Sequence, residues 1–179
     1  RLLNRARNAV RVLSPDIDIP TTKVLAETLT QLEGQLQQWV DCLPLTLRFN
    51  MPLESAPMLE EGELMKLSRE RYVEVRELLC RAYLYLCIHV PLDPEMTAQY
   101  GVKASEALRL AVYRIQNEVP FFRHPGSWGA CRVRFNHAAC LIAGSRAKLA
   151  RHPSAEYVRV PPDWAEYVRV VIERLKIWG

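Results

Sequence analysis

The sequence lacks any run of about 18 uncharged apolar residues, which a membrane-spanning helix would need. Its arginine-bearing start is also too polar for the apolar segment of a signal peptide. No segment alternates convincingly between apolar and polar residues, and the longest β-branched cluster, Val168–Ile172, lies inside a helical pattern. We therefore expect no membrane span and no β-sheet.

Motifs that carry phosphate or metal chemistry are missing as well. No glycine-rich phosphate loop occurs, and the cysteines do not form the close pairs that zinc sites use. The cysteines are odd in number and lie in apolar stretches, so we interpret them as reduced, buried thiols of a cytosolic or nuclear protein. They are Cys42, Cys80, Cys87, Cys131 and Cys140.

Two histidine–cysteine pairs come nearest to a metal site. His137 and Cys140 lie three residues apart in one predicted helix, and His124 and Cys131 are near each other in the sequence. Because zinc needs four converging ligands, we interpret these residues as ordinary surface and core positions. We expect no metal ligand and no cofactor-binding residue in this chain.

Ser127 comes nearest to a catalytic nucleophile. The sequence Gly126-Ser127-Trp128-Gly129 lacks the glycine spacing of a nucleophile elbow, and no strand precedes it, so we interpret the hydroxyl as a helix cap. His89 ends a predicted helix, where its charged form would favour the helix dipole. We expect no catalytic residue and no enzyme activity, and the sequence does not identify a residue that binds a ligand or partner.

Charge is nearly balanced, with 24 basic and 20 acidic residues and a net charge of +4, which does not indicate a nucleic-acid-binding protein. Residues 123–159 hold seven basic residues and one acid, Glu156. We favour solvated helix faces for this region and keep a phosphate-binding surface as the alternative. An acidic run, also interpreted as solvated, lies in a predicted loop at Glu60, Glu61 and Glu63.

Proline positions predict the helix boundaries, because proline removes a backbone donor and clashes with the preceding turn. All twelve prolines fall between segments of helical periodicity, which leaves six predicted helices. The predicted helices are Leu2–Leu13, Thr21–Leu43, Leu64–Val90, Val102–Val119, Gly126–Arg151, and a last helix capped by Asp163 that reaches Trp178.

Each predicted helix carries apolar residues at steps of three and four, which place them on one face. In the fifth helix this pattern predicts a buried stripe, and Gly144 indicates a tight helix crossing. That stripe comprises Trp128, Cys131, Phe135, Ala138, Ile142 and Leu149. The third helix is expected to be central, with a stripe of Tyr72, Val75, Leu79, Ala82, Leu86 and Val90.

The length of 179 residues suffices for a sizeable core without disulfides or metals. No internal repeat of fixed period occurs, which disfavours a solenoid. We predict an all-α fold, a single irregular bundle of about six helices packed as antiparallel pairs, forming one domain over residues 1–179.

Four blocks, in this order, carry a resemblance to a known family. The first is Leu32–Trp39 followed by Leu43-Pro44, and the second runs from Tyr72 through Tyr83-Leu84-Tyr85 to His89 and Pro91. The third is the turn 123–128 leading into Cys140–Ala143, and the fourth is Val160–Trp164 leading to Trp178. Together these blocks resemble the middle homology region of fungal transcription factors that bind DNA through a zinc binuclear cluster.

The third block departs from the family's arginine-histidine-histidine-glycine-threonine-tryptophan turn at Pro125 and Ser127. The resemblance implies a nuclear, all-helical regulatory domain that is part of a longer factor. It would contact other segments of the factor, transcriptional co-regulators or a small-molecule inducer. It would reach DNA only through a separate zinc-containing module that this sequence lacks, and homodimerisation of the whole factor is left open.

Two alternatives to a regulatory domain remain: a generic helical protein-interaction scaffold with no DNA-related role, and a helical enzyme. An enzyme would need a deep pocket where polar groups converge. Within the regulatory interpretation, aromatic side chains could line a ligand cavity, although they could equally form core. The aromatic residues considered are Trp39, Tyr83, Tyr85, Phe121, Phe122 and Trp128.

Overall fold

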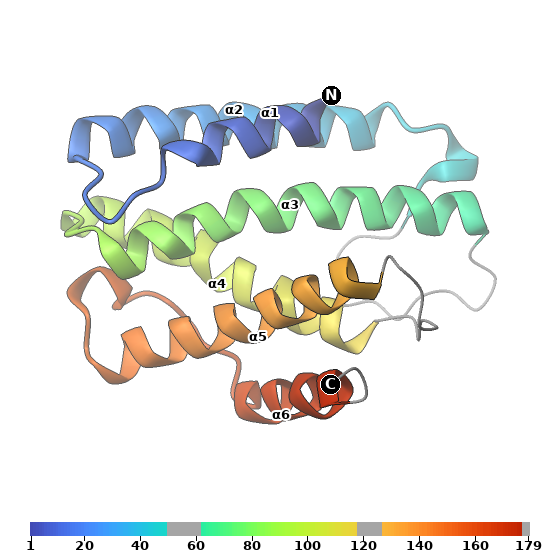
Figure 1. Ribbon diagram of the computed structural model, residues 1–179. Coiled ribbons are helices and arrows are strands. Elements are labelled where there is room, and N and C mark those ends of the chain that lie inside the picture. Colours follow the sequence, from blue (N-terminus) through green and yellow to red (C-terminus); the bar gives the residue numbers. More distant parts are fainter. Residues whose placement is uncertain (50–61, 118–126, 177–179) are drawn as a thin grey trace. The chain divides into compact units, whose positions relative to one another are not determined.

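The computed structural model describes residues 1–49, 62–117 and 127–176. Over these residues the only regular secondary structure is helical, and the predicted all-α fold is confirmed (Figure 1). None of the helices in the described part is both long and apolar enough to cross a membrane. The α-helices are α1 (Leu2–Ala9), α2 (Ile19–Asp41), α3 (Glu63–His89), α4 (Pro94–Gln116), α5 (Ser127–Leu149) and α6 (Trp164–Lys176). Short 3-10 helices are η1 (Val10–Val12), η2 (Leu45–Leu47) and η3 (Pro153–Ala155).

The chain divides into two compact units, residues 1–82 and 83–179, and the boundary falls inside α3. The sequence predicts one domain over residues 1–179, and this stays a prediction.

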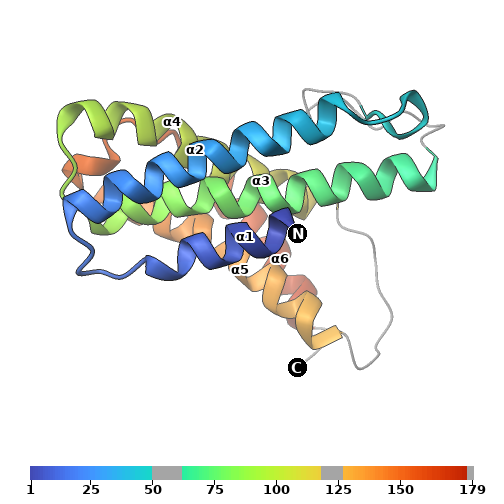
Figure 2. The ribbon, with the colours of Figure 1, turned by 90° about the horizontal axis from the view of Figure 1, so that it is seen from above.

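The first unit contains α1, α2 and most of α3. Neighbouring helices run antiparallel, and α2 lies along α3 in two perpendicular views (Figures 1 and 2). Ion pairs join the helices at Arg7–Glu74 (3.2 Å) and Arg76–Glu33 (3.7 Å). The predicted α3 stripe is buried in this unit at Tyr72, Val75 and Leu79. In α2 the spacing predicts a stripe of Leu25, Leu29, Leu32, Leu36, Trp39 and Leu43, and all of these are buried except Trp39, which is 37% exposed.

Two helices begin earlier than the sequence predicts. The Asp18 carboxylate accepts a hydrogen bond from the Thr21 backbone N–H (2.7 Å), and the Asp93 carboxylate accepts one from Met96 (2.8 Å). Each aspartate therefore caps a helix whose first turn contains a proline. The prediction that every proline lies outside a helix is wrong at Pro20 and Pro94, because the first turn needs no proline N–H. As a result α4 begins at Pro94 and not at Val102.

Glu63 differs from its predicted place as well. It is the first residue of α3, whereas the sequence places it in an acidic loop. A carboxylate in the first turn is favourable next to the exposed backbone N–H groups of the helix. Glu60 and Glu61 lie outside the described residues.

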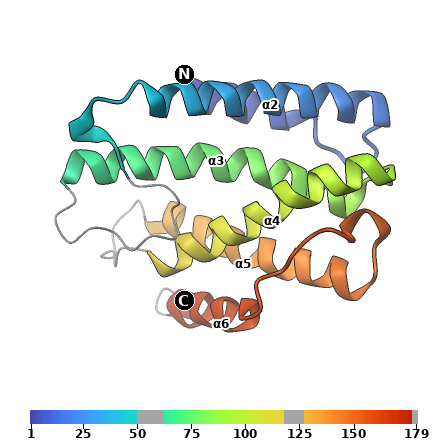
Figure 3. The same ribbon diagram turned by 180° about the vertical axis from the view of Figure 1, so that it is seen from behind.

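The second unit contains the end of α3, then α4, α5 and α6. Helix α5 packs against both α4 and α6, as Figure 3 shows from the far side. A Cβ atom added at Gly144 would lie 2.9 Å from the Leu108 Cδ1 atom, so the predicted close crossing exists between α5 and α4. The segment after α5, which contains η3, returns across the start of α4 before α6 begins.

The predicted buried stripe of α5 is wrong at four of its six positions, while Ala138 is buried and Cys131 is half-buried. Trp128, Phe135, Ile142 and Leu149 are exposed, by 79, 61, 38 and 78% of their surface. The buried face carries small and polar residues instead: Ser127, Arg134, His137, Ala138, Leu141, Gly144, Ser145 and Ala147. Small residues let α5 approach α4 closely, as at Gly144, and this approach turns the bulky apolar residues outward.

Candidate functional site

The candidate nucleophile and the candidate metal ligands of the sequence do not form a reactive centre in the described part of the chain. Ser127 is buried at the start of α5, and His137 is buried on the same helix while Cys140 is half-buried. No group of three or more His, Cys, Asp or Glu side chains suited to a metal ion occurs among the described residues. His124 lies outside them, and the role of Ser127 as a cap stays a prediction.

His89 is exposed at the last position of α3, where the sequence places it. Its ring lies 4.3 Å, centroid to centroid, from the ring of Tyr85 one turn earlier. A contact of this kind orders the end of the helix and presents no substrate-binding cavity.

The hypothesis of an aromatic ligand cavity stays a prediction, and the residues that can be placed give it no support. Trp128 is largely exposed, Trp39 is partly exposed, and the half-buried Tyr85 contacts His89. Tyr83 is buried, with its ring 5.2 Å from that of Tyr100, and this pair forms core. Phe121 and Phe122 lie outside the described residues.

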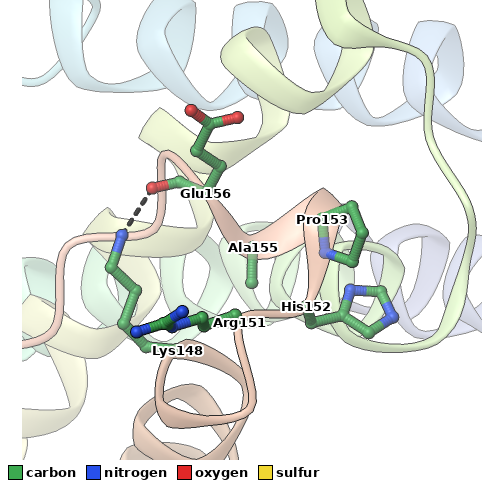
Figure 4. A pocket seen from close by; sticks show the side chains of 6 residues that line it. All are labelled: Lys148, Arg151, His152, Pro153, Ala155 and Glu156. Atoms are coloured by element: carbon green, nitrogen blue, oxygen red, sulfur yellow. Dashed lines mark hydrogen bonds between the residues drawn. The ribbon is translucent and has the colours of Figure 1, made fainter.

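A pocket of about 260 Å³ lies where α5 ends and η3 begins (Figure 4). Its lining comprises Lys148, Arg151, His152, Pro153, Ala155 and Glu156. The Lys148 ammonium donates a hydrogen bond to the Glu156 carbonyl oxygen (2.5 Å), while the Glu156 carboxylate points away from the ammonium. The lining holds no Ser, Thr or Cys nucleophile, and its basic groups fit a small anion better than a reaction centre.

The pocket was not identified from sequence, although the basic residues of segment 123–159 gave a weak signal. The pocket volume is below the usual range for sites of drug-sized ligands, about 300–1,000 Å³. One wall atom, Nδ1 of His152, is buried and has no hydrogen-bond partner in the described structure. The geometry keeps the phosphate-binding alternative open at this position.

Arg151 closes α5 in a conformation that usually requires glycine. Its φ is 53°, in the left-handed region. The Arg151 N–H bonds to the Lys148 carbonyl (3.1 Å), and the His152 N–H bonds to the Ala147 carbonyl (3.0 Å), which together form a Schellman ending. A side chain at such a position costs roughly 1 kcal/mol that glycine avoids.

We expect Arg151→Gly to raise the free energy of unfolding by about 1 kcal/mol, because glycine adopts the left-handed conformation without steric cost. Urea denaturation followed by circular dichroism would measure the change. Arg109→Gly, at an exposed position inside α4, is the matched control and should lower the same free energy by about 1 kcal/mol. A destabilising Arg151→Gly substitution would contradict this account of the helix end.

The cysteines differ sharply in environment. Cys80 and Cys87 are buried, as predicted, but Cys42, at the C-cap of α2, is exposed, and Cys131 and Cys140 are only half-buried. Burial raises the pKa of the Cys87 thiol to about 12, from an ordinary value of 9.0. The neutral thiol is therefore the form that the folded state prefers.

We expect iodoacetamide at pH 8 to label Cys42 readily and Cys87 about a thousandfold more slowly than in the unfolded chain, since a thiolate is the reactive form and three pKa units separate the two states. Mass spectrometry of labelled peptides would give both rates. Rapid labelling of Cys87 without unfolding would contradict the burial of this residue.

The same shift predicts an alkaline loss of stability. Between about pH 9 and about pH 12 the unfolded state loses the Cys87 proton while the folded state keeps it. Each pH unit in this window should lower the free energy of unfolding by about 1.4 kcal/mol from this group alone. Cys87→Ala should make the decline with pH shallower, which denaturant titrations at several pH values would test.

A second surface feature is the exposed row on α5 formed by Trp128, Phe135, Ile142 and Leu149, called the α5 stripe below. The four residues are seven positions apart, so they stay in line along the helix. In the sequence, this spacing predicts that the four residues are buried in the core. Only the packing of the opposite face against α4 and α6 shows that the α5 stripe faces outward.

Comparisons of the chain with protein-family descriptions, with curated proteins and with solved structures found no match.

Proposed function

We propose that this chain is a regulatory domain of a fungal transcription factor of the zinc binuclear cluster family. The observation that carries the proposal is the order of the four sequence blocks between residues 32 and 178. The all-α fold supports it, because the resemblance implies a helical domain. The domain would work in the nucleus, without enzymatic activity, and would affect transcription by contacts with other parts of the factor, co-regulators or a small inducer.

The regulatory role would rest on a shift between helix packings, biased by whichever ligand or partner binds one packing more tightly. No cofactor is assigned to this chain, and zinc would belong to the separate DNA-binding module. Contact with DNA would then occur only through that module.

A tethering assay in yeast tests the proposal. Residues 1–179 would be inserted between a heterologous DNA-binding domain and a constitutive activation segment, and reporter output would be compared with that of an unrelated helical insert of similar length. We expect at least a threefold change in output (about 0.7 kcal/mol at RT of about 0.59 kcal/mol), in either direction, since the resemblance does not separate activators from repressors. Equal output from both inserts would contradict a regulatory role.

The second candidate function is a helical protein-interaction scaffold with no role in transcription. The α5 stripe favours it, because contiguous exposed apolar side chains mark interaction sites on helical surfaces. The sequence of the full-length protein would separate the two candidates. A zinc-cluster module in the same polypeptide supports the regulator, and a polypeptide without any DNA-binding module supports the scaffold.

A further inference from the structure

The α5 stripe combines exposed apolar surface with unbalanced charge. Helix α5 contains four basic residues and no acid, and three of the basic residues, Arg132, Arg146 and Lys148, are exposed. Arg132 lies four residues after Trp128 and three before Phe135, and Arg146 occupies the same place in the second half of the stripe. Both guanidinium groups therefore belong to the row of the apolar residues and not to a separate face.

Neither arginine is neutralised within the part of the chain that the structure describes, because none of those residues forms an ion pair with Arg132 or Arg146. The position midway between them is Ala139, whose small side chain leaves room for a helix to approach closely. The four large apolar residues, Ala139 and the two arginines thus follow one another along the α5 stripe at steps of four and three residues. Such a row matches the 3.5-residue repeat with which one helix packs along another.

We propose that the α5 stripe docks an amphipathic α-helix of another protein segment that is acidic beside its apolar face. The stripe extends over 22 residues from Trp128 to Leu149, about 30 Å along the helix. A partner helix of about six turns would cover it. Its apolar residues would meet the α5 stripe, and carboxylates about two heptads apart would meet Arg132 and Arg146.

Charge disfavours a second copy of this chain as the occupant. An antiparallel pair of α5 helices centred on Ala139 would bring Arg132 of each copy against Arg146 of the other. Like charges at a helix interface oppose pairing, whereas an acidic helix removes the conflict and gains two ion pairs. The proposed surface does not depend on the regulatory role, since a scaffold could use it equally.

A displayed library of helices tests the proposal. The helices would be about six turns long and apolar at about every seventh residue, with flanking positions drawn equally from Glu, Gln and Lys. Purified protein covering residues 1–179 serves as the target. We expect the selected helices to be enriched in Glu at two positions about fourteen residues apart.

Variants of the target locate the binding surface. Phe135→Ser should weaken binding of a selected helix at least about tenfold, because aromatic residues at the centre of an interface carry much of its binding energy. The double variant Arg132→Gln and Arg146→Gln should also weaken binding and should remove most of its dependence on salt. Val102→Ser and Arg109→Gln, at exposed positions of α4, are the matched controls and should bind as the native protein does.

Four outcomes would overturn the proposal. They are the absence of any selected helix, selection of helices enriched in Gln or Lys, binding that survives Phe135→Ser, and equal loss of binding in the α4 control variants. Sedimentation velocity and flotation with vesicles of anionic phospholipid test the other occupants. If no helix binds and Phe135→Ser abolishes a dimer, the α5 stripe pairs with a second copy of the chain. If no helix binds and Phe135→Ser abolishes vesicle binding, the α5 stripe binds a membrane surface.

Discussion

Replacing Ser154 with alanine is expected to lower the free energy of unfolding by about 3 kcal/mol. The Ser154 hydroxyl is buried in η3, where it donates a hydrogen bond to the Val90 carbonyl (2.7 Å) and accepts one from the Leu92 N–H (2.9 Å). Alanine would leave both backbone groups of the α3–α4 connection without this partner. A buried polar group that loses its partner costs about 1–3 kcal/mol.

Urea denaturation would measure the effect of Ser154→Ala, and amide hydrogen exchange would show whether Leu92 loses protection. Ser68→Ala is the matched control, because the Ser68 hydroxyl bonds at the surface to the Leu64 carbonyl of its own helix (2.9 Å). The control should change the free energy of unfolding by less than about 0.5 kcal/mol. If the two variants lose the same stability, Ser154 does not hold the η3 segment in place.

Gly101→Ala is expected to lower the free energy of unfolding by about 2 kcal/mol. A Cβ atom at this position would lie 2.6 Å from Tyr157 Cβ and 3.0 Å from the Tyr157 carbonyl carbon. The Tyr157 carbonyl carbon is a backbone atom and its Cβ atom is fixed to the backbone. No rotation about a side-chain bond therefore relieves the overlap. Displacing the segment costs more than the roughly 1 kcal/mol that alanine gains over glycine inside a helix.

The control for Gly101→Ala is Gly34→Ala in α2, where nothing lies within 4 Å of the added Cβ atom. This exposed substitution should raise the free energy of unfolding by about 0.5–1 kcal/mol through helix propensity alone. Thermal and urea denaturation of both variants would show opposite signs. A Gly101→Ala protein as stable as the native one would show that Tyr157 does not press on α4.

Much of the fold follows from residue spacing. The α3 stripe from Tyr72 to Val90 is buried as predicted, because a helix with one apolar face must cover that face. The start of α4 differs from the prediction because Pro94 lies in the first turn of the helix, where Asp93 supplies the cap, and not at a boundary outside it. Distances along the chain could also not reveal that the η3 segment reaches back to Val90 and Gly101.

Helix α5 shows where spacing alone fails. Its predicted core row is an exposed row, and its buried face includes Arg134 and His137. Hydrophobic periodicity predicts that this segment is a helix. It does not predict which face of the helix is buried when small residues on the opposite face allow close packing. The pocket at Lys148, Arg151 and His152 likewise lies at the left-handed turn after α5. The sequence does not predict this turn, because the residue in the left-handed conformation is Arg151 and not a glycine.

The sequence by itself determined that this chain is helical, where most of its helices run and which faces of α2 and α3 are buried. These properties are local, because they follow from apolar residues that recur once per turn and from prolines between them. Only the tertiary structure decided that the α5 stripe faces outward and that Arg132 and Arg146 are exposed there without an ion pair to a described residue. That outcome depends on how closely α5 can approach α4, which is set by the fit at Gly144 and Leu108 and not by the order of residues along one helix.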